Sequence, residues 1–159
     1  MNAAEEIVKY WYQQKGYFLM ESIRLPRNKE IDFLAVKLSE DGKKVLERLH
    51  IEVQVANRFA NYVDSPQEIA KNYHKSKFLD VRPNVCQILG SKYRMIEVRG
   101  KMAYRNNDIR ETYIKLREKK NVEVIPFEKI LKEVQDQLIT NSQLNSAVQA
   151  LQLVKFQLG

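Results

Sequence analysis

The chain has 159 residues, with 27 Lys and Arg against 20 Asp and Glu, and a formal net charge of +7. This length predicts one domain with a buried core, and a content of 44% hydrophobic and 30% charged residues argues against disorder. One cysteine and two histidines are too few for a tetrahedral zinc site, so oxygen atoms would supply most ligands of any bound metal. The excess of positive charge favours association with polyanions such as nucleic acids.

The sequence also predicts the compartment. No apolar run is long enough to cross a bilayer, and the N-terminus lacks the basic region and apolar stretch of a secretory signal. We therefore expect a soluble, intracellular protein, cytoplasmic in location, without membrane contact. Cys86 cannot form an internal disulfide, and the apolar segment VCQILG around it predicts a buried strand in which Cys86 is a small hydrophobic residue.

The first predicted elements are a helix and three strands. Asn2 is a suitable N-cap for a helix over residues 3–14, since two glutamates follow in its first turn and Gly16 can end it. Turn residues separate the strands that follow, and the third strand, LHIEVQVA, alternates apolar and polar side chains. The three strands are expected over residues 18–25, 30–38 and 49–56.

Further helices and strands follow. Ser65 and Pro66 open a helix that reaches about residue 79, as N-cap and first helical residue. We then expect short strands over 85–89, 95–98 and 122–126, and helices over 109–120 and 127–139. From Asn141 onward, apolar residues at helical spacing favour a final helix that docks on the body or on another subunit. This order predicts an α/β fold with a mixed sheet.

Two acidic residues fall in strands. Asp32 stands within EIDFLAVKL, which is nearly continuous in apolar residues, and an ionised carboxylate is unfavourable there unless it is paired or bound to a metal. Glu52 and Gln54 share one face of the next strand, opposite an aliphatic face. Two alternatives stay open at this point. Asp32 can pair with a nearby Lys or Arg, and Glu52 and Gln54 can be the solvent-side residues of a half-exposed strand.

The order of these residues resembles the PD-(D/E)XK nucleases, in which an acidic helix precedes a strand with Asp and a strand with Glu-x-Lys. The resemblance covers roughly residues 3–90. It implies a restriction-endonuclease-like αβββαβ core within a single domain over 1–159, with a C-terminal elaboration over about 91–159 that adds helices. The matching residues are Glu5 or Glu6, then Asp32 in EIDFLAV, then Glu52, Val53 and Gln54 in HIEVQV.

The resemblance also implies an activity and residue roles. The superfamily hydrolyses DNA phosphodiester bonds with Mg²⁺, for which Mn²⁺ can substitute, and includes homing, restriction, repair and junction-resolving enzymes. Asp32 would bridge metal and substrate, Glu52 would be the second ligand, and the main-chain carbonyl of Val53 a third. Glu5 lies nearer the buried stripe of its helix than Glu6 does, so it would orient a water molecule or a second metal. Both glutamates can instead simply complement the helix dipole.

Two positions depart from the family pattern. Ile31 replaces the proline, which is a loosely held position. Gln54 replaces the lysine, and an amide supplies hydrogen bonds but no positive charge. Some members of the superfamily carry glutamine there, and others take the lysine from a neighbouring helix. The candidates here are Lys71, which we prefer, and Lys75, spaced i and i+4 on the helix after the third strand. Gln67 resembles the helix glutamine of some members.

Loops beside the catalytic strands are the expected places for contacts with double-stranded DNA. A lone domain of this size would cut both strands as a homodimer or higher oligomer. Two other functions stay open: a catalytically silent DNA-binding or assembly module with the nuclease fold, and a basic α/β protein whose acidic residues are salt-bridged. The candidate DNA contacts are Arg24, Arg27, Asn28, Lys29, Asn57, Arg58, Arg94 and Arg99.

Overall fold

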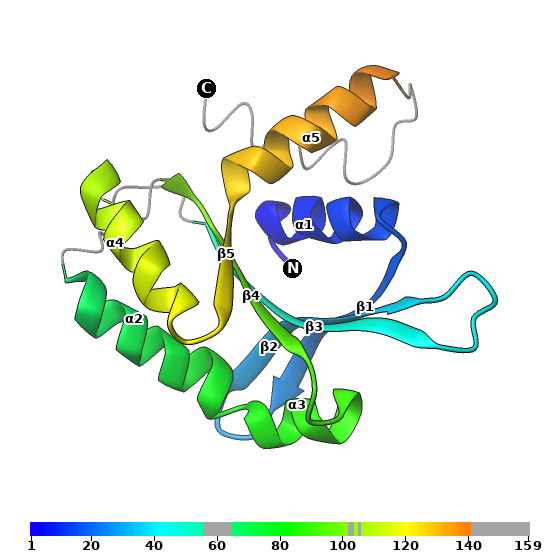
Figure 1. Cartoon of the computed structure of the whole chain (residues 1–159), viewed down its shortest axis with the longest axis horizontal. Coiled ribbons are helices and arrows are strands. Elements are labelled where there is room, and N and C mark those ends of the chain that lie inside the picture. The colour runs from blue at the N-terminus through cyan, green and yellow to red at the C-terminus, as the bar shows by residue number, and fades with distance from the viewer. Residues whose placement is uncertain (56–64, 102–103, 105, 141–159) are drawn as a thin grey trace.

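The computed structural model describes residues 1–55, 65–101, 104 and 106–140 of the chain (Figure 1). A five-stranded sheet lies between two layers of helices. In chain order the elements are α1 (Ala3–Gln14), β1 (Tyr17–Leu25), β2 (Lys29–Leu38), β3 (Val45–Gln54), α2 (Pro66–His74), the π-helical turn η1 (Lys75–Leu79), α3 (Arg82–Leu89), β4 (Arg94–Arg99), α4 (Asn107–Glu118), β5 (Val122–Pro126) and α5 (Phe127–Thr140).

The sheet is mixed and has the strand order β1-β2-β3-β4-β5. The first three strands form an antiparallel meander, whereas β3, β4 and β5 are parallel to one another. Parallel neighbours need a crossover connection, which α2, η1 and α3 provide between β3 and β4. The predicted α/β class with a mixed sheet is therefore confirmed.

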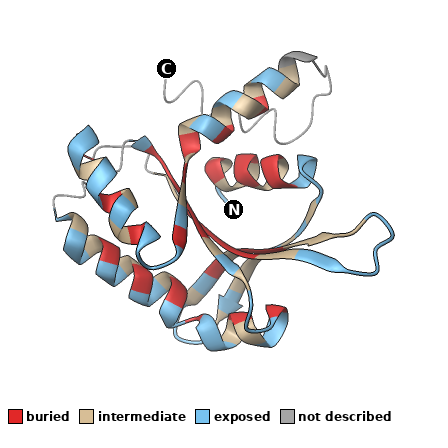
Figure 2. Cartoon of the chain, viewed as in Figure 1, coloured by how far each residue is buried: buried red, intermediate tan, exposed pale blue. Residues whose placement is uncertain are grey.

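Helices α1 and α5 cover one face of the sheet (Figure 1). Ile7, Val8 and Trp11 of α1 belong to the same apolar core as Ile130 and Val134 of α5 and the inward residues of β2, β3 and β4. Figure 2 shows the buried residues of both helices along the sides that face the sheet. These spacings of three and four residues keep the apolar side chains on one side of each helix.

The other face is covered by α2, η1, α3 and α4 (Figure 1). Val85 of α3 packs on Leu34 of β2 in one small apolar cluster. Ala70 of α2 and Tyr113 of α4 belong to a second cluster. Fully buried charged residues, such as Glu52, Glu97 and Arg117, lie on this face as well.

Alternation along β3 decides which side chains reach this second face. Ile51 and Val53 belong to the core under α1 and α5. His50 and Glu52 point the other way, and the His50 ring lies 4.8 Å from the Phe78 ring of η1, measured between centroids. The predicted alternation is confirmed. The polar face is nevertheless not solvent-exposed, because both His50 and Glu52 are fully buried.

The predicted strand over residues 85–89 is wrong, because these residues belong to α3. A proline stands at the N-terminus of this helix, and Val85 and Leu89, four residues apart, are both buried. A spacing of four places both side chains on one side of a helix, so the apolar run serves a helix rather than a strand. Cys86 is correspondingly half-buried on α3 and is not a buried strand residue.

The last strand of the predicted αβββαβ order is therefore β4 and not residues 85–89. Both β4 and β5 lie beyond residue 90 and belong to the same sheet. The final helix predicted from Asn141, with its proposed oligomer contact, lies outside the described residues. Within the described ranges, no helix combines the length and hydropathy of a membrane-spanning segment.

Helix α2 continues directly into η1, which is a single π-helical turn. The Asp80 N–H donates to the Lys75 carbonyl across 2.8 Å, a bond between residues i and i+5. A π-turn contains more residues than an α-turn, so it rotates the side chains that follow. Phe78 is thereby buried against the sheet, and Lys77 is brought to β3.

Candidate functional site

Asp32 and Glu52 lie on the face of the sheet that α2 and η1 cover. Leu34 of β2 and His50 of β3 are partners in the antiparallel ladder. Asp32 precedes Leu34 by two residues and Glu52 follows His50 by two, so both carboxyl groups lie on the same face as these partners. The two acidic residues of the sequence motif are thus brought together from neighbouring strands.

Each carboxyl group has one oxygen engaged in a hydrogen bond. The Val53 N–H donates to Asp32 Oδ2 across 2.8 Å, since the main-chain ladder between β2 and β3 ends two residues earlier, at Ile51. His50 Nε2 lies 2.8 Å from Glu52 Oε1. Glu52 Oε2 is buried and accepts no hydrogen bond within the described part of the chain.

Burial and mutual repulsion make this pair difficult to ionise. Burial, and then the negative charge of Glu52, raise the pKa of Asp32 to about 7. Burial also raises the pKa of Glu52 to about 7, although its interaction with Asp32 and the positive charge of Lys77 oppose the rise. Within the described residues these two desolvated carboxyl groups have one lysine beside them, and a further cation would stabilise their ionised forms.

The oxygens present fit a hard divalent cation. Mg²⁺ prefers carboxylate and carbonyl ligands, keeps several waters and needs few protein oxygens. Asp32 and Glu52 would supply two, and the Val53 carbonyl faces the same neighbouring strand as the Val53 N–H that Asp32 binds. Among the described residues, no group of three or more His, Cys, Asp or Glu side chains could hold a metal ion. The ligand set would therefore be two carboxylates and one main-chain oxygen.

His50 orients Glu52, a role that the sequence analysis did not assign. Its ring is fully buried and lies against Phe78 and, at 6.3 Å between centroids, Tyr93. Burial lowers the pKa of His50 to about 4, so the ring is neutral near pH 7. A neutral ring with its proton on Nε2 donates to Glu52 Oε1, which fixes the direction of the other Glu52 oxygen.

The lysine that faces the carboxyl pair is Lys77 of η1. Its Nζ lies 3.9 Å from Glu52 Oε2, and its side chain is 36% exposed. Its positive charge lowers the pKa of both Asp32 and Glu52. Lys71 and Lys75, the candidates predicted from α-helical spacing, instead line a cleft between α2 and α4. The neighbouring helix does supply a lysine, but the π-turn presents one that an i, i+4 rule cannot select.

Glu5 has a clear structural role. The Asn2 main-chain N–H and side-chain Nδ2 each donate to a different Glu5 oxygen across 3.0 Å, and the Glu5 N–H donates to Asn2 Oδ1 across 2.9 Å. This capping box stabilises the start of α1. Burial raises the pKa of Glu5, the bond to Asn2 opposes the rise, and the negative charge of Asp32 adds to it. Glu5 is therefore near enough to Asp32 for the two carboxyl groups to interact electrostatically. Its catalytic role stays a prediction.

Four predicted DNA contacts lie at the β1–β2 hairpin, beside the strand that carries Asp32. Arg24, Arg27 and Asn28 are exposed there. Arg27 and Asn28 have φ angles of 64° and 57°, the left-handed conformation of a tight turn. Lys29 is half-buried and pairs with Asp80 across 3.3 Å. The exposed tip can reach a phosphate backbone without losing an ion pair.

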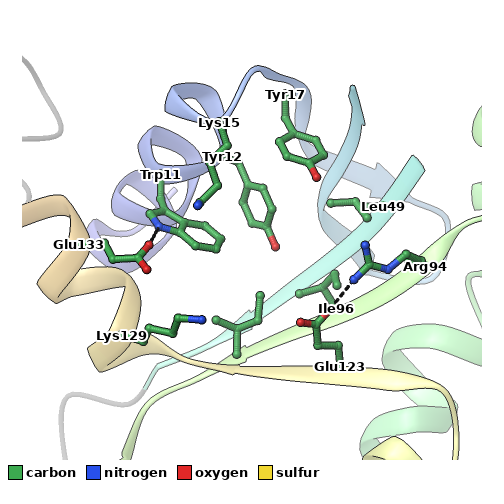
Figure 3. Close-up of a pocket in the computed structure, with 11 residues that line it drawn as sticks. Trp11, Tyr12, Lys15, Tyr17, Leu49, Arg94, Ile96, Glu123, Lys129 and Glu133 are labelled. Atoms are coloured by element: carbon green, nitrogen blue, oxygen red, sulfur yellow. Dashed lines mark hydrogen bonds and ion pairs between the residues drawn. The ribbon is translucent and has the colours of Figure 1, made fainter. Parts of the chain in front are cut away.

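The other four predicted DNA contacts are not gathered at this site. Arg94 lines a pocket of about 200 Å³ on the opposite face of the sheet, under α1 and α5, where it pairs with Glu123 (Figure 3). It also pairs with Glu47 of β3. Arg99 is 5% exposed and bound to Glu97. Burial therefore keeps Arg99 from contacting DNA, whereas the contact predicted for Arg94, whose side chain is 58% exposed, stays a prediction. Asn57 and Arg58 lie outside the described residues.

Strand β4 repeats the motif of β3, since residues 96–99 (IEVR) match residues 51–54 (IEVQ). The parallel ladder pairs Glu52 with Glu97 and Gln54 with Arg99. Gln54 is half-buried beside Arg99, on the face of Glu52. Glu97 was not predicted from the sequence, although it lies between two apolar strand residues just as Glu52 does.

Glu97 differs from Glu52 because its charge is compensated. Arg99 Nη1 and the Tyr113 hydroxyl donate to Glu97 Oε1 across 2.5 and 2.6 Å, and Arg117 Nε donates to Oε2 across 2.8 Å. All four residues are buried. One carboxylate here faces two guanidinium groups, so this cluster has an excess of positive charge, whereas the neighbouring Asp32–Glu52 pair has an excess of negative charge.

The Asp32 pKa predicts how Asp32→Asn changes stability with pH when EDTA removes divalent ions. The pKa is about 7 in the folded chain, against 3.8 for an aspartate in the unfolded chain, so the folded chain binds more protons between these limits. The free energy of unfolding contributed by Asp32 therefore falls as pH rises through this window. Asparagine resembles the protonated acid and still accepts from the Val53 N–H. Urea unfolding should show similar stabilities near pH 4 and a variant more stable than the wild type, by on the order of 4 kcal/mol, near pH 8. An equal difference at both pH values would contradict the raised pKa of Asp32.

No relative contributes to this assignment. We compared the chain with protein families, curated proteins and solved structures, and none matches. The site residues are therefore assigned from their positions and contacts in this chain alone.

Proposed function

We propose that this chain is a divalent-metal-dependent DNA endonuclease with a restriction-endonuclease-like core of the PD-(D/E)XK kind. The proposal depends on one observation: the carboxyl groups of Asp32 and Glu52, from neighbouring strands, are buried close together. The positive charge of Lys77 does not balance both of them. The element order supports it. An N-terminal helix, an antiparallel meander, a helix and a strand parallel to β3 match the αβββαβ order that the sequence resemblance implies.

Each side chain of the site has a task in this proposal. Asp32 and Glu52 hold Mg²⁺, or Mn²⁺ in its place, with the Val53 carbonyl. The bound ion supplies an activated water molecule and neutralises charge on the phosphoryl oxygens. Lys77, whose side chain is partly exposed, provides the ammonium group that Gln54 cannot. His50 holds the Glu52 carboxylate in place.

The proposed substrate is double-stranded DNA, and the proposed place of action is inside the cell, where DNA is accessible. The exposed β1–β2 hairpin, with Arg24, Arg27 and Asn28, would contact phosphates next to the scissile one. Cleavage of both strands needs two active sites, so we propose a homodimer or a higher homo-oligomer. Whether the role is homing, restriction or junction resolution depends on the DNA that is cut.

A second candidate is a catalytically silent DNA-binding or assembly module with the same fold. Two observations favour it: Gln54 stands at the lysine position, and one oxygen of each carboxylate is already hydrogen-bonded, to His50 or to Val53. Such a module would bind DNA through the hairpin and leave it intact.

The two candidates differ in a cleavage assay. Supercoiled plasmid, linear duplex and four-way junction DNA are each incubated with the protein in Mg²⁺, in Mn²⁺ and in EDTA. The nuclease predicts cleavage of at least one substrate that stops in EDTA. Binding of all three substrates without cleavage in either metal supports the silent module and contradicts the nuclease.

Lys77→Met should reduce cleavage by about 10- to 100-fold with little change in DNA affinity, because it removes the cation that pairs with Glu52 among the described residues. The control Lys115→Met removes an exposed lysine on α4, outside the proposed metal site, and should cleave DNA at the wild-type rate. A variant Lys71→Met compares the two assignments directly. Loss of cleavage in Lys71→Met with normal cleavage in Lys77→Met would restore the lysine predicted from helical spacing.

A further inference from the structure

The cleft between α2 and α4 has a volume of about 680 Å³. The two helices run side by side in Figure 1. One side is formed by Lys71 and His74 of α2 and by Lys75, the first residue of η1, at spacings of three and four residues from Lys71. The other side is formed by the end of α4, with Arg117 and Lys120 nearby. The Asp32–Glu52 pair does not line this cleft, so the two places are separate.

The inner wall of the cleft contains buried polar atoms that lack partners. Arg117 is fully buried; its Nε binds Glu97, and its Nη1 donates to the Ala70 carbonyl across 3.1 Å. Arg117 Nη2 has no hydrogen-bond partner within the described residues, and neither has Nδ1 of His74, which is 8% exposed. A buried donor without an acceptor is unfavourable by about 1–3 kcal/mol. An acceptor bound in the cleft would remove this cost.

The charge around the cleft is strongly positive. The carboxylate that lines it, Asp80, is already paired with Lys29. Arg117 shares the single Glu97 carboxylate with Arg99, so its charge is only partly compensated. Burial, and then the positive charges of Arg117 and Lys120, lower the pKa of His74, against a small opposing effect of Glu97. The cleft therefore favours an anion with hydrogen-bond acceptors.

We propose that the cleft between α2 and α4 binds a phosphate group, with Arg117 Nη2 as the buried donor and Lys71, Lys75 and Lys120 as the surrounding cations. A phosphoryl group supplies several acceptor oxygens and the negative charge that this cluster lacks, and guanidinium groups match its geometry. The phosphate belongs either to a small phosphorylated molecule or to a nucleic-acid backbone. The site exists whether or not the chain cuts DNA.

The two histidines provide a direct test by NMR, because His74 lines the cleft and His50 lies beside Glu52. The protein is titrated in EDTA with inorganic phosphate, with pyrophosphate and with a short single-stranded oligonucleotide, and with sodium chloride at matched ionic strength. We expect the His74 ring signals to shift to saturation with a phosphate-bearing probe, and the His74 pKa to rise, while the His50 signals stay in place.

The choice of probe distinguishes a small phosphorylated molecule from a nucleic-acid backbone. Saturation with phosphate or pyrophosphate supports a site for small phosphorylated molecules, and saturation with the oligonucleotide alone supports a backbone site. No saturable shift with any probe, or an equal shift with chloride, would overturn the proposal.

A matched pair of variants tests the residues. Lys71→Gln, Lys75→Gln and Lys120→Gln are combined in one variant, and Lys43→Gln, Lys44→Gln and Lys115→Gln in another, so that each loses three exposed lysines. The cleft variant should bind the probe at least about tenfold more weakly, whereas the control should bind within about twofold of the wild type. Equal weakening in both would show a general charge effect and would also overturn the proposal. The probes contain no divalent metal, so a negative result in this titration would not contradict the nuclease proposal. An absence of DNA cleavage would likewise not contradict the phosphate site.

Discussion

Asp32→Asn is expected to lower Mg²⁺-dependent DNA cleavage by at least about a hundredfold while DNA binding and the fold remain intact. The substitution replaces one of the two charged oxygen donors by a neutral amide, which also removes the repulsion between Asp32 and Glu52. Asparagine still accepts the hydrogen bond from the Val53 N–H, so the link between β2 and β3 persists. The measurement is the initial rate on the DNA substrate that the wild type cuts fastest, with binding followed separately by fluorescence anisotropy.

The control for this variant is Asp41→Asn in the β2–β3 turn. Asp41 is exposed and accepts only local hydrogen bonds, from Ser39 and Lys43. Both variants lose one negative charge, so a nonspecific change in DNA attraction would affect them alike. Undiminished cleavage by Asp32→Asn, or equal losses in both variants, would remove Asp32 from the metal site.

The second large effect is expected on stability. Glu97→Gln should lower the free energy of unfolding by about 3–5 kcal/mol, because it leaves two buried guanidinium groups without their carboxylate. The amide oxygen can accept one of the bonds from Arg99, Tyr113 and Arg117, but it carries no charge. The measurement is urea unfolding near pH 7.

Glu123→Gln is the matched control, since Glu123 lies on the adjacent strand β5 and also pairs with an arginine. That pair with Arg94 is more than half exposed on both sides. Exposed ion pairs contribute about 0–1 kcal/mol, so this variant should be nearly as stable as the wild type. A loss below about 1 kcal/mol in Glu97→Gln, or a similar loss in both variants, would mean that the buried cluster is not needed for stability.

The convergence of Asp32 and Glu52 could be predicted from the sequence because it depends only on local rules. The two residues lie on consecutive antiparallel strands joined by a short turn. Alternation along each strand then fixes the face on which each side chain points. The α/β class and the mixed sheet followed from the order of elements for a similar reason.

The parts that escaped prediction depend on contacts distant in sequence or on rare local geometry. Lys77 reaches Glu52 only because η1 is a π-turn, and helical spacing assumes a regular α-helix. Arg99 was predicted on a DNA-binding surface, but Tyr113 and Arg117 of α4 enclose it with Glu97. Such a cluster joins residues from separate elements, which no single-strand pattern reveals.

The most direct test of the account is calorimetric titration of the protein with Mn²⁺, because everything assigned to Asp32 and Glu52 requires that they bind a divalent ion. We predict saturable binding at a single site, weakened by at least about tenfold in Glu52→Gln and unchanged in Glu123→Gln. A folded wild-type protein that binds no Mn²⁺, or that binds it as tightly as Glu52→Gln does, would contradict the account.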